Sequence, residues 1–227
     1  MKAILLCAGK GTRLKPYTNT IPKCLMLIKN KPLLEIWLEN LNNSGVDEFL
    51  INTHHLSQKV DKFILSNRYK DNITTAYEEE LLGTAGTLIS NLTFYGENDG
   101  ILIHADNYCL EDMASFIKSH NERPKNCQIT LMSFRTTNPS SCGILEIDSN
   151  NIVQKIHEKV TNPPGNLANG AVYIISKDIF NYLKKYYKNA NEFTTEILKD
   201  FEGKIYSHET SKKFIDIGTE ENYLSVL

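Results

Sequence analysis

The stretch MKAILLCAGKGTRL (residues 1–14), completed by IPK (residues 21–23), decides the fold of this chain. Residues 3–6 are apolar without alternation, which is typical of a parallel strand that is buried on both faces. The small residues that follow let backbone N–H groups approach a ligand closely and form an anion-binding concavity; they are Ala8, Gly9 and Gly11. Arg13 and Lys23 add positive charge. The stretch therefore predicts a polyphosphate site at the end of the first strand.

Two familiar phosphate-binding loops do not fit this stretch. A dinucleotide fingerprint needs G-x-G-x-x-G, but Leu14 stands where the third glycine belongs, and the spacing of GKGT (residues 9–12) fails the Walker pattern. A glycine turn after an edge strand remains an alternative, because small-residue loops are common after strands. The glycines alone leave that alternative open, and Arg13 and Lys23 favour the anion site.

Composition and charge narrow the class of protein. The chain has 227 residues, of which 41% are hydrophobic and 23% charged, which suits one large α/β domain with a full core. A net charge of −2 gives no basic field to attract nucleic acid. Five scattered cysteines without a C-x-x-C pair argue against a zinc site and for a reducing compartment. No apolar run has the length of a membrane span or signal peptide, so we expect a cytoplasmic protein without a membrane partner; its oligomeric state stays open.

Strand and helix patterns alternate along the first half. Residues 33–43 carry apolar side chains at helical spacing, residues 49–51 and 73–77 read as strands, and Ser57 looks like the cap of an intervening helix. This βαβα order predicts a parallel sheet with right-handed crossovers. His54 and His55 follow the second strand, but no carboxylate or thiol lies at ligand spacing, which favours loop residues over metal ligands.

Later segments place polar residues at further strand ends. The strand at residues 100–104 leads to Asp106, where open α/β sheets bind ligands, although a helix-capping role is the alternative. The segment GTAG (residues 83–86) begins a helix, and helix starts favour anions. Residues 142–147 and 152–157 form a predicted hairpin. Glu158 and Lys159 follow it and could form an exposed surface pair.

The string GKGTRLKPYTNTIPKCL (residues 9–25) resembles the signature of the sugar-nucleotide pyrophosphorylases, the sugar-1-phosphate nucleotidyltransferases. Their pattern is G-x-G-T-R-[LM]-x-P-x-T followed by P-K, and around this block the chain departs from the usual residues at Cys7 and Cys24. The resemblance implies a Rossmann-like α/β fold, with a mixed, mostly parallel sheet flanked by helices and a small β-rich sugar-binding portion. It also implies a single domain, with residues 1–135 for the nucleotide and residues 136–227 for the sugar phosphate and a closing helix.

The resemblance also implies a nucleotide site. Its residues would be Leu6, Ala8, Gly9, Gly11, Thr12, Glu78, Gly83 and Thr84. EEELLGTAGTL (residues 78–88) is most similar to the guanylyltransferase branch, which acts on mannose 1-phosphate and heptose 1-phosphate. A carboxylate only accepts hydrogen bonds. Glu78 could therefore take both adjacent donors of guanine, whereas uracil and thymine suit a glutamine amide better. GTP is accordingly the expected nucleotide.

The metal and sugar sites follow from the same resemblance. Asp106 and Asp216 would hold Mg²⁺, which prefers oxygen ligands and keeps several waters. The sugar phosphate would contact residues of the second half, namely Gly143, Glu158, Lys159 and Asn169. The chain has Ala105, Val160 and Glu220 where the family has glycine, proline and proline, and the change at Ala105 leaves Asp106 in register.

The implied reaction is attack of a sugar 1-phosphate on the α-phosphate of a nucleoside triphosphate, with pyrophosphate leaving. The expected catalytic residues are Arg13 at the pyrophosphate, Lys23 at the α-phosphate and Lys159 at the sugar phosphate. One alternative is a uridylyl-, thymidylyl- or cytidylyltransferase for another sugar phosphate. The other is a catalytically silent subunit that binds nucleotide sugars, but the presence of both Asp106 and Asp216 argues against it.

Overall fold

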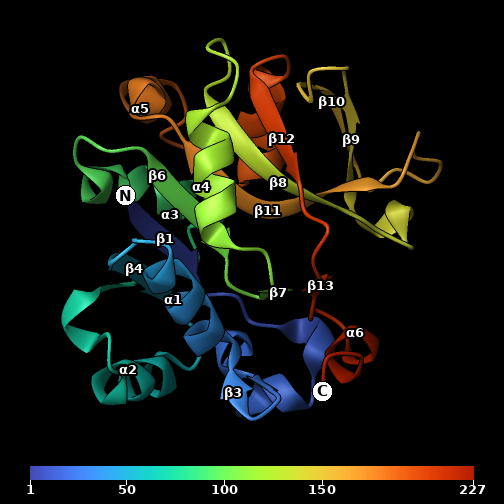
Figure 1. The fold of residues 1–227 in the computed structure, drawn as a ribbon. Helices are drawn as coiled ribbons and strands as arrows, with labels where there is room; N and C mark the ends of the chain where they lie inside the picture. Colours follow the sequence, from blue (N-terminus) through green and yellow to red (C-terminus); the bar gives the residue numbers. More distant parts are fainter.

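A nine-stranded sheet runs through the molecule in the order β10–β9–β11–β6–β1–β4–β5, with β8 beside β11 and β12 beside β8 (Figure 1). The structure is a computed structural model that describes residues 1–227. The strands are β1 (Lys2–Leu6), β4 (Glu48–Thr53), β5 (Ile73–Tyr77), β6 (Gly100–His104), β8 (Ile129–Arg135), β9 (Gly143–Ile147), β10 (Val153–Glu158), β11 (Leu167–Ile175) and β12 (Ile205–Glu209). All except β10 and β11 point in one direction. The predicted mixed, mostly parallel sheet is confirmed.

Helices and two small ribbons surround this sheet. The α-helices are α1 (Leu33–Asn43), α2 (Ser57–Ser66), α3 (Gly83–Ser90), α4 (Met113–Asn121), α5 (Phe180–Tyr186) and α6 (Glu220–Leu224). The ribbons pair β2 (Leu27–Ile28) with β3 (Lys31–Pro32), and β7 (Asn107–Cys109) with β13 (Phe214–Asp216). Single 3-10 turns cover Thr12–Leu14, Tyr17–Asn19, Lys23–Leu25, Lys70–Asn72, Leu92–Tyr95, Pro139–Ser141, Lys177–Ile179 and Leu198–Phe201, and Phe193–Ile197 is a π-helical turn.

Both faces of β1 are buried, as its uninterrupted apolar run predicts. Ala3 and Leu5 belong to a core that includes apolar residues of α1, α2 and α4. Ile4 belongs to a second core on the other face, formed with α3 and residues 193–201. Full burial of one such side chain stabilises the fold by about 1.5–3 kcal/mol, so two-sided burial fixes β1 firmly at the centre of the sheet.

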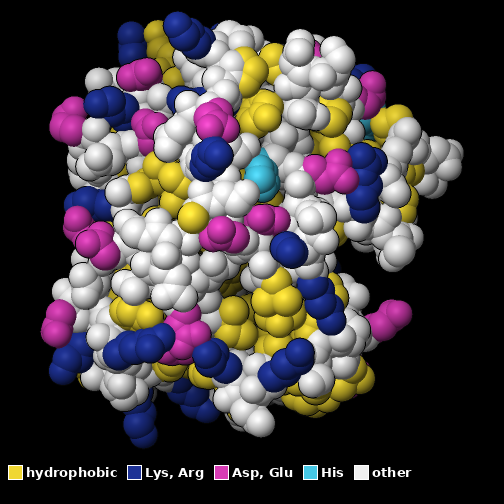
Figure 2. All heavy atoms as spheres, in the orientation of Figure 1, with side chains coloured by type: hydrophobic (Ala, Val, Ile, Leu, Met, Phe, Trp, Pro, Cys, Tyr) yellow, Lys and Arg dark blue, Asp and Glu magenta, His cyan; other side chains and the backbone are white.

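Helix α1 spans the predicted residues, but the predicted cap of α2 is wrong. Leu56 occupies the N-cap position in a left-handed conformation (φ 54°), and Ser57 is already the first helical residue. None of the helices is both long and apolar enough to cross a bilayer. On the face shown in Figure 2, acidic and basic side chains are interspersed over the surface.

The last elements of the chain pack against its first loop (Figure 1). Tyr223 in α6 meets Tyr17 edge-on, with ring centroids 5.7 Å apart, and its hydroxyl donates to the Leu27 carbonyl at 3.0 Å. The Tyr17 hydroxyl donates to Glu220 Oε1 at 3.1 Å. These contacts hold β13, and with it Asp216, beside the N-terminal loop.

A buried histidine links α4 to the sheet. His120 Nδ1 lies 2.8 Å from Thr130 Oγ1 in β8, and Nε2 lies 3.1 Å from Asp99 Oδ2. Burial lowers the pKa of His120 below its usual value, although the bond to Asp99 opposes the shift. The same bond lowers the pKa of Asp99. The neutral ring therefore donates to Asp99 and accepts from Thr130.

This linkage predicts that the protein loses stability in mild acid. The pKa of His120 is lower in the folded than in the unfolded chain, so its contribution is complete above the unfolded pKa of about 6.5 and declines as pH falls through that value. We expect the urea midpoint of the wild type to fall between pH 7.5 and 5.5. His120→Gln should be less stable at pH 7.5 but show a shallower decline, and an equally steep decline in this variant would contradict the assignment.

Candidate functional site

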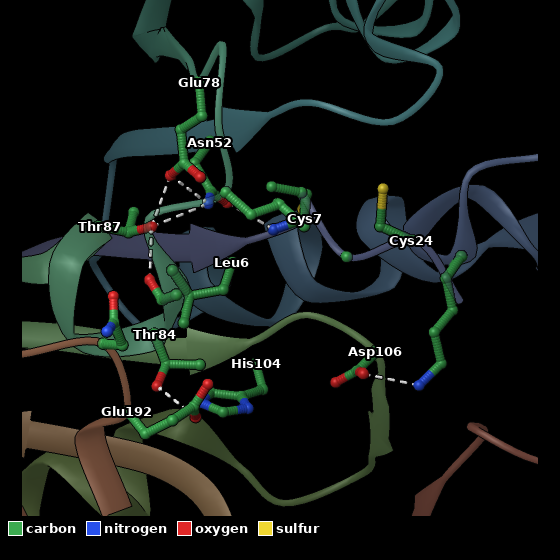
Figure 3. A pocket seen from close by; sticks show the side chains of 16 residues that line it. Leu6, Cys7, Cys24, Asn52, Glu78, Thr84, Thr87, His104, Asp106 and Glu192 are labelled. Atoms are coloured by element: carbon green, nitrogen blue, oxygen red, sulfur yellow. Dashed lines mark hydrogen bonds and ion pairs between the residues drawn. The ribbon is translucent and has the colours of Figure 1, made fainter. Parts of the chain in front are cut away.

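A cavity of about 400 Å³ opens at the carboxyl ends of β1, β4, β5 and β6 (Figure 3). Open α/β sheets bind ligands at this edge, and the volume lies within the usual range of about 300–1,000 Å³ for small-molecule sites. Eight of the residues predicted from the sequence line the cavity: Leu6, Ala8, Gly9, Lys23, Glu78, Gly83, Thr84 and Asp106. Residues far apart in the sequence thus meet in one site.

The glycine-rich loop folds back on itself next to this cavity. Gly11 has a left-handed conformation (φ 59°), and an added Cβ would lie 2.7 Å from Thr18 Cγ2. The Thr18 hydroxyl donates to the Gly11 carbonyl at 2.8 Å. This close approach requires glycine at position 11 and leads the chain back, so that Lys23 reaches the cavity. Gly11, Thr12 and Arg13 lie outside the cavity lining.

Lys23 joins both predicted metal-binding aspartates. Its Nζ lies 2.6 Å from Asp106 Oδ2 and 3.1 Å from Asp216 Oδ1, and only 8% of its side chain is exposed. Arg13 Nη2 lies 3.6 Å from Asp216 Oδ2. Burial raises the pKa of Asp106, but the charge and hydrogen bond of Lys23, helped by His104, outweigh burial and leave this pKa below its usual value. Asp106 is therefore held in its charged form beside Lys23.

These two carboxylates fit the requirements of Mg²⁺. Their oxygens contact the same ammonium group, so both carboxylates face one point at which they could contribute oxygen ligands to a cation. No set of three or more histidine, cysteine, aspartate or glutamate side chains is grouped for a metal ion. Mg²⁺ typically binds through one or two carboxylates together with waters and substrate phosphates, so this two-carboxylate set suits it and would not form a complete protein cage.

Glu78 lies in the wall of the cavity beside Asn52 and Thr87 (Figure 3), and three donors fix its carboxylate. Its Oε1 accepts from Asn52 Nδ2 at 2.8 Å and from Thr87 Oγ1 at 2.5 Å, and its Oε2 accepts from the Leu82 amide at 3.1 Å. A carboxylate offers about four acceptor positions. About one therefore remains for a ligand, which is fewer than the two that the sequence interpretation assigned to guanine.

Asn52 and Thr87 were not singled out from the sequence. Asn52 also accepts from the Cys7 amide at 2.7 Å, so it connects β1 to Glu78. The sequence feature that could have identified Asn52 is a polar residue within the apolar strand FLINT (residues 49–53). Thr87 gave no signal of its own, because a threonine one turn inside a helix is commonplace.

Gly83 brings a distant loop to the cavity. It has φ 74°, and a Cβ at this position would overlap the carbonyl oxygen of Asn191. The Ala85 amide donates to that same carbonyl at 2.9 Å, and the Phe193 amide donates to Thr84 Oγ1 at 2.8 Å. Asn191 and its neighbour Glu192 thereby join the lining, which the sequence did not predict.

We expect Gly83→Ala to destabilise the protein by about 3 kcal/mol, because it combines left-handed strain with a steric overlap that backbone must relieve. Gly45→Ala is the matched control, since Gly45 has φ 80° but no atom within 4 Å of an added Cβ. It should cost only about 1–2 kcal/mol. Urea unfolding measures both values, and equal losses would show that the contact with Asn191 is unimportant.

The predicted sugar-phosphate residues form a second group outside the cavity lining. A Cβ on Gly143 would lie 2.5 Å from Glu158 Oε2 and 3.8 Å from Asn169 Cβ, so these three residues are close neighbours. Asn169 Nδ2 donates to the Tyr173 hydroxyl at 2.9 Å. The Lys159 side chain is exposed, and its Nζ lies 3.5 Å from Glu158 Oε1. The structure thus brings together Gly143, Glu158 and Asn169, with Lys159 at their edge.

The remaining lining includes a histidine and two cysteines. Burial lowers the pKa of His104, although Asp106 and Glu192 oppose this shift. Contact with Cys24, together with burial, raises the pKa of the Cys7 thiol well above its usual value, so this thiol stays protonated. His54 Nδ1 lies 2.9 Å from the Glu78 carbonyl oxygen, and His55 Nε2 lies 3.0 Å from the Thr18 carbonyl oxygen. These backbone contacts agree with the prediction that both are loop residues and not metal ligands.

A Rossmann-like sheet with a lysine–carboxylate cluster beside a glycine-rich loop defines a class of proteins that bind phosphorylated ligands. Comparison with known families places the chain within that class. The family described as "Nucleotidyl transferase" matches residues 2–227. The chain belongs to this family.

Several relatives are similar over most or all of the chain. A D-glycero-alpha-D-manno-heptose 1-phosphate guanylyltransferase of Campylobacter jejuni is 29% identical, over 100% of this chain and 99% of the relative. A putative mannose-1-phosphate guanyltransferase of Sulfolobus acidocaldarius is 28% identical, and the chain spans 62% of its length. A UTP–glucose-1-phosphate uridylyltransferase of Synechocystis is 28% identical over 81% of this chain.

Solved structures agree with the fold. HddC from Yersinia pseudotuberculosis, in complex with GMP-PN, has a TM-score of 0.82 at 27% identity and covers 99% of this chain and 97% of its own. A putative glucose-1-phosphate thymidylyltransferase from Bacillus anthracis has a TM-score of 0.87 at 21% identity, covering 100% of this chain and 93% of its own, which supports the fold alone.

Proposed function

We propose that this protein transfers a guanylyl group from GTP to a mannose- or heptose-type sugar 1-phosphate, forming a GDP-sugar and pyrophosphate. The observation that carries the proposal is one cavity lined both by the lysine–aspartate pair Lys23–Asp106 and by the fixed carboxylate of Glu78. The pair would neutralise the phosphates of a triphosphate, and the acceptor position that remains on Glu78 would take one N–H of the base. The guanylyltransferase names of the Campylobacter and Sulfolobus relatives support the choice of GTP.

The chemistry requires two anions to meet. Unit charges 4 Å apart interact by about 1 kcal/mol in water but by about 4 kcal/mol at an effective dielectric constant of 20, so a closed site must neutralise them. Arg13 would act on the departing pyrophosphate, Lys23 on the α-phosphate and Lys159 on the sugar phosphate. Mg²⁺ on Asp106 and Asp216 would supply further positive charge. The sugar phosphate is itself the nucleophile, so the residues act by positioning and charge stabilisation.

The test is pyrophosphate release with GTP, UTP, dTTP, CTP and ATP, each paired with mannose 1-phosphate, D-glycero-D-manno-heptose 1-phosphate and glucose 1-phosphate. We expect the highest kcat/KM with GTP and one of the first two sugars. A higher kcat/KM with another nucleotide than with GTP would reject guanylyl transfer but retain the reaction class. No turnover with any pair would favour a silent nucleotide-sugar-binding protein.

Glu78→Gln provides a sharper test of the nucleotide. The glutamine amide would place an NH₂ donor among the three groups that now donate hydrogen bonds to the Glu78 carboxylate. We therefore expect kcat/KM with GTP to fall about tenfold or more, and the preference for GTP over UTP to narrow. Glu80→Gln is the matched control, because Glu80 is exposed in the same segment and outside the cavity lining. An unchanged nucleotide preference in Glu78→Gln would remove Glu78 from base recognition.

A further inference from the structure

His104, the last residue of β6, has the one buried side-chain nitrogen or oxygen without a hydrogen-bond partner. This atom is Nε2, and its side chain lines the cavity. Leaving a buried polar atom unpaired costs free energy, which a protein usually avoids by pairing the atom. An unpaired atom in the wall of a ligand cavity therefore indicates a partner that arrives with the ligand.

We propose that His104 and Glu192 form a subsite that binds a hydroxyl group of the sugar 1-phosphate and helps to decide which sugar is accepted. This inference rests on the proposed function and deepens it, since it names residues that select the sugar. A neutral imidazole carries one N–H donor and one acceptor nitrogen, and a carboxylate accepts. A hydroxyl group both donates and accepts, so it can satisfy this pair.

Glu192 is held in position for this role. Figure 3 shows it near His104, on the same side of the cavity as Thr84. Thr84 Oγ1 lies 3.3 Å from Glu192 Oε2, and the Glu192 amide donates to Glu196 Oε1 at 2.8 Å. The loop conformation that Gly83 permits is therefore what places this carboxylate in the wall.

The neighbours of His104 connect it to the sugar group of residues. Its ring meets Tyr173 edge-on at a centroid distance of 6.4 Å, and the Tyr173 hydroxyl is bonded to Asn169. Tyr173 also packs against Phe193, the residue after Glu192, and their ring centroids lie 4.9 Å apart. His104 is also two residues from Asp106, where the phosphates would meet. The subsite is thus connected both to the phosphate centre and, through Tyr173, to the group formed by Gly143, Glu158 and Asn169, which favours the sugar over the nucleotide.

The test compares His104→Leu and His104→Gln with the wild type, varying mannose 1-phosphate and GTP separately. We expect His104→Leu to raise the KM for mannose 1-phosphate at least about tenfold while the KM for GTP changes less than about twofold, and His104→Gln to recover part of the loss. Glu192→Gln should also affect the sugar alone. Thermal unfolding checks that each variant is folded, and His104→Gln keeps the test valid if the leucine variant is not.

Monodeoxy analogues of mannose 1-phosphate identify the hydroxyl group. One analogue should lose about tenfold or more in kcat/KM with the wild type, and His104→Leu should abolish that difference. Equal penalties in both proteins would overturn the inference. A loss of discrimination between GTP and 2′-deoxy-GTP would also overturn it, because the hydroxyl would then belong to ribose. A wild type that turns over no sugar phosphate would instead refute the proposed function, and the subsite with it.

Discussion

Lys23→Met is expected to reduce turnover at least about a hundredfold, the scale seen when one electrostatic stabiliser is removed from an active site. The buried ammonium lies within 3.1 Å of both Asp106 and Asp216, and the cavity lining holds no other lysine or arginine. The two carboxylates are partly exposed, so the free energy of unfolding should fall by only about 1 kcal/mol. Pyrophosphate release and urea unfolding measure the two effects.

The same variant separates catalysis from metal binding. Without the ammonium, two neighbouring carboxylates are free to accept a divalent cation, so Mn²⁺ should bind more tightly in the absence of nucleotide while turnover is lost. Lys10→Met is the matched control, because Lys10 is exposed in the same loop and outside the cavity lining. A Lys23→Met enzyme with near-normal turnover would contradict the role given to Lys23.

Asp106→Asn is the second variant expected to have a large effect. Removing this carboxylate's charge leaves one of the two predicted Mg²⁺ ligands, so we expect turnover to fall at least about a hundredfold. Lys23 would retain Asp216 as its partner. The fold should persist, because the amide keeps the size of the carboxylate and its segment is held by the pairing of β7 with β13.

Two measurements test this variant. Steady-state pyrophosphate release gives the rate, and titration of Mn²⁺ in the presence of GTP gives the metal affinity, which should weaken with the rate. Asp71→Asn serves as control, since Asp71 is an exposed residue of the turn at Lys70–Asn72. Unchanged metal affinity in Asp106→Asn would remove this residue from the proposed metal site.

The sequence predicted elements whose signals are local. The pattern of apolar residues within each segment indicates which side chains are buried. This holds for the apolar run of β1, the helical spacing of α1 and the alternating hairpin of β9 and β10, and the structure contains all of them. Strand β12 was missed because its core-facing Ser207 hides the apolar pattern; this serine pairs with Ser133 of β8 at 2.8 Å. Its place in the sheet depends on a partner that lies far away in the sequence.

As with the fold, the part of the site that depends on local sequence was predictable. Residues inside contiguous motifs, such as Lys23 and Asp106, were identified, and the structure places them together. Asn52, His104 and Glu192 were missed because their significance arises from tertiary contacts: a shared carboxylate, an unpaired nitrogen and a loop held by Thr84. The ion pairing of Lys23 with both aspartates likewise follows from packing and is not visible in any motif.

The contact between the two ends of the chain has a consequence for the order of folding. Arg13 and Lys23 belong to the first elements, yet their partner Asp216 lies in β13, about two hundred residues later. A folding intermediate without β13 and α6 would carry these cations with incomplete neutralisation and would lack half of the proposed metal site. We therefore expect activity only after β13 has packed against the first loop. Local detachment of residues 214–224 should abolish activity while the central sheet remains folded.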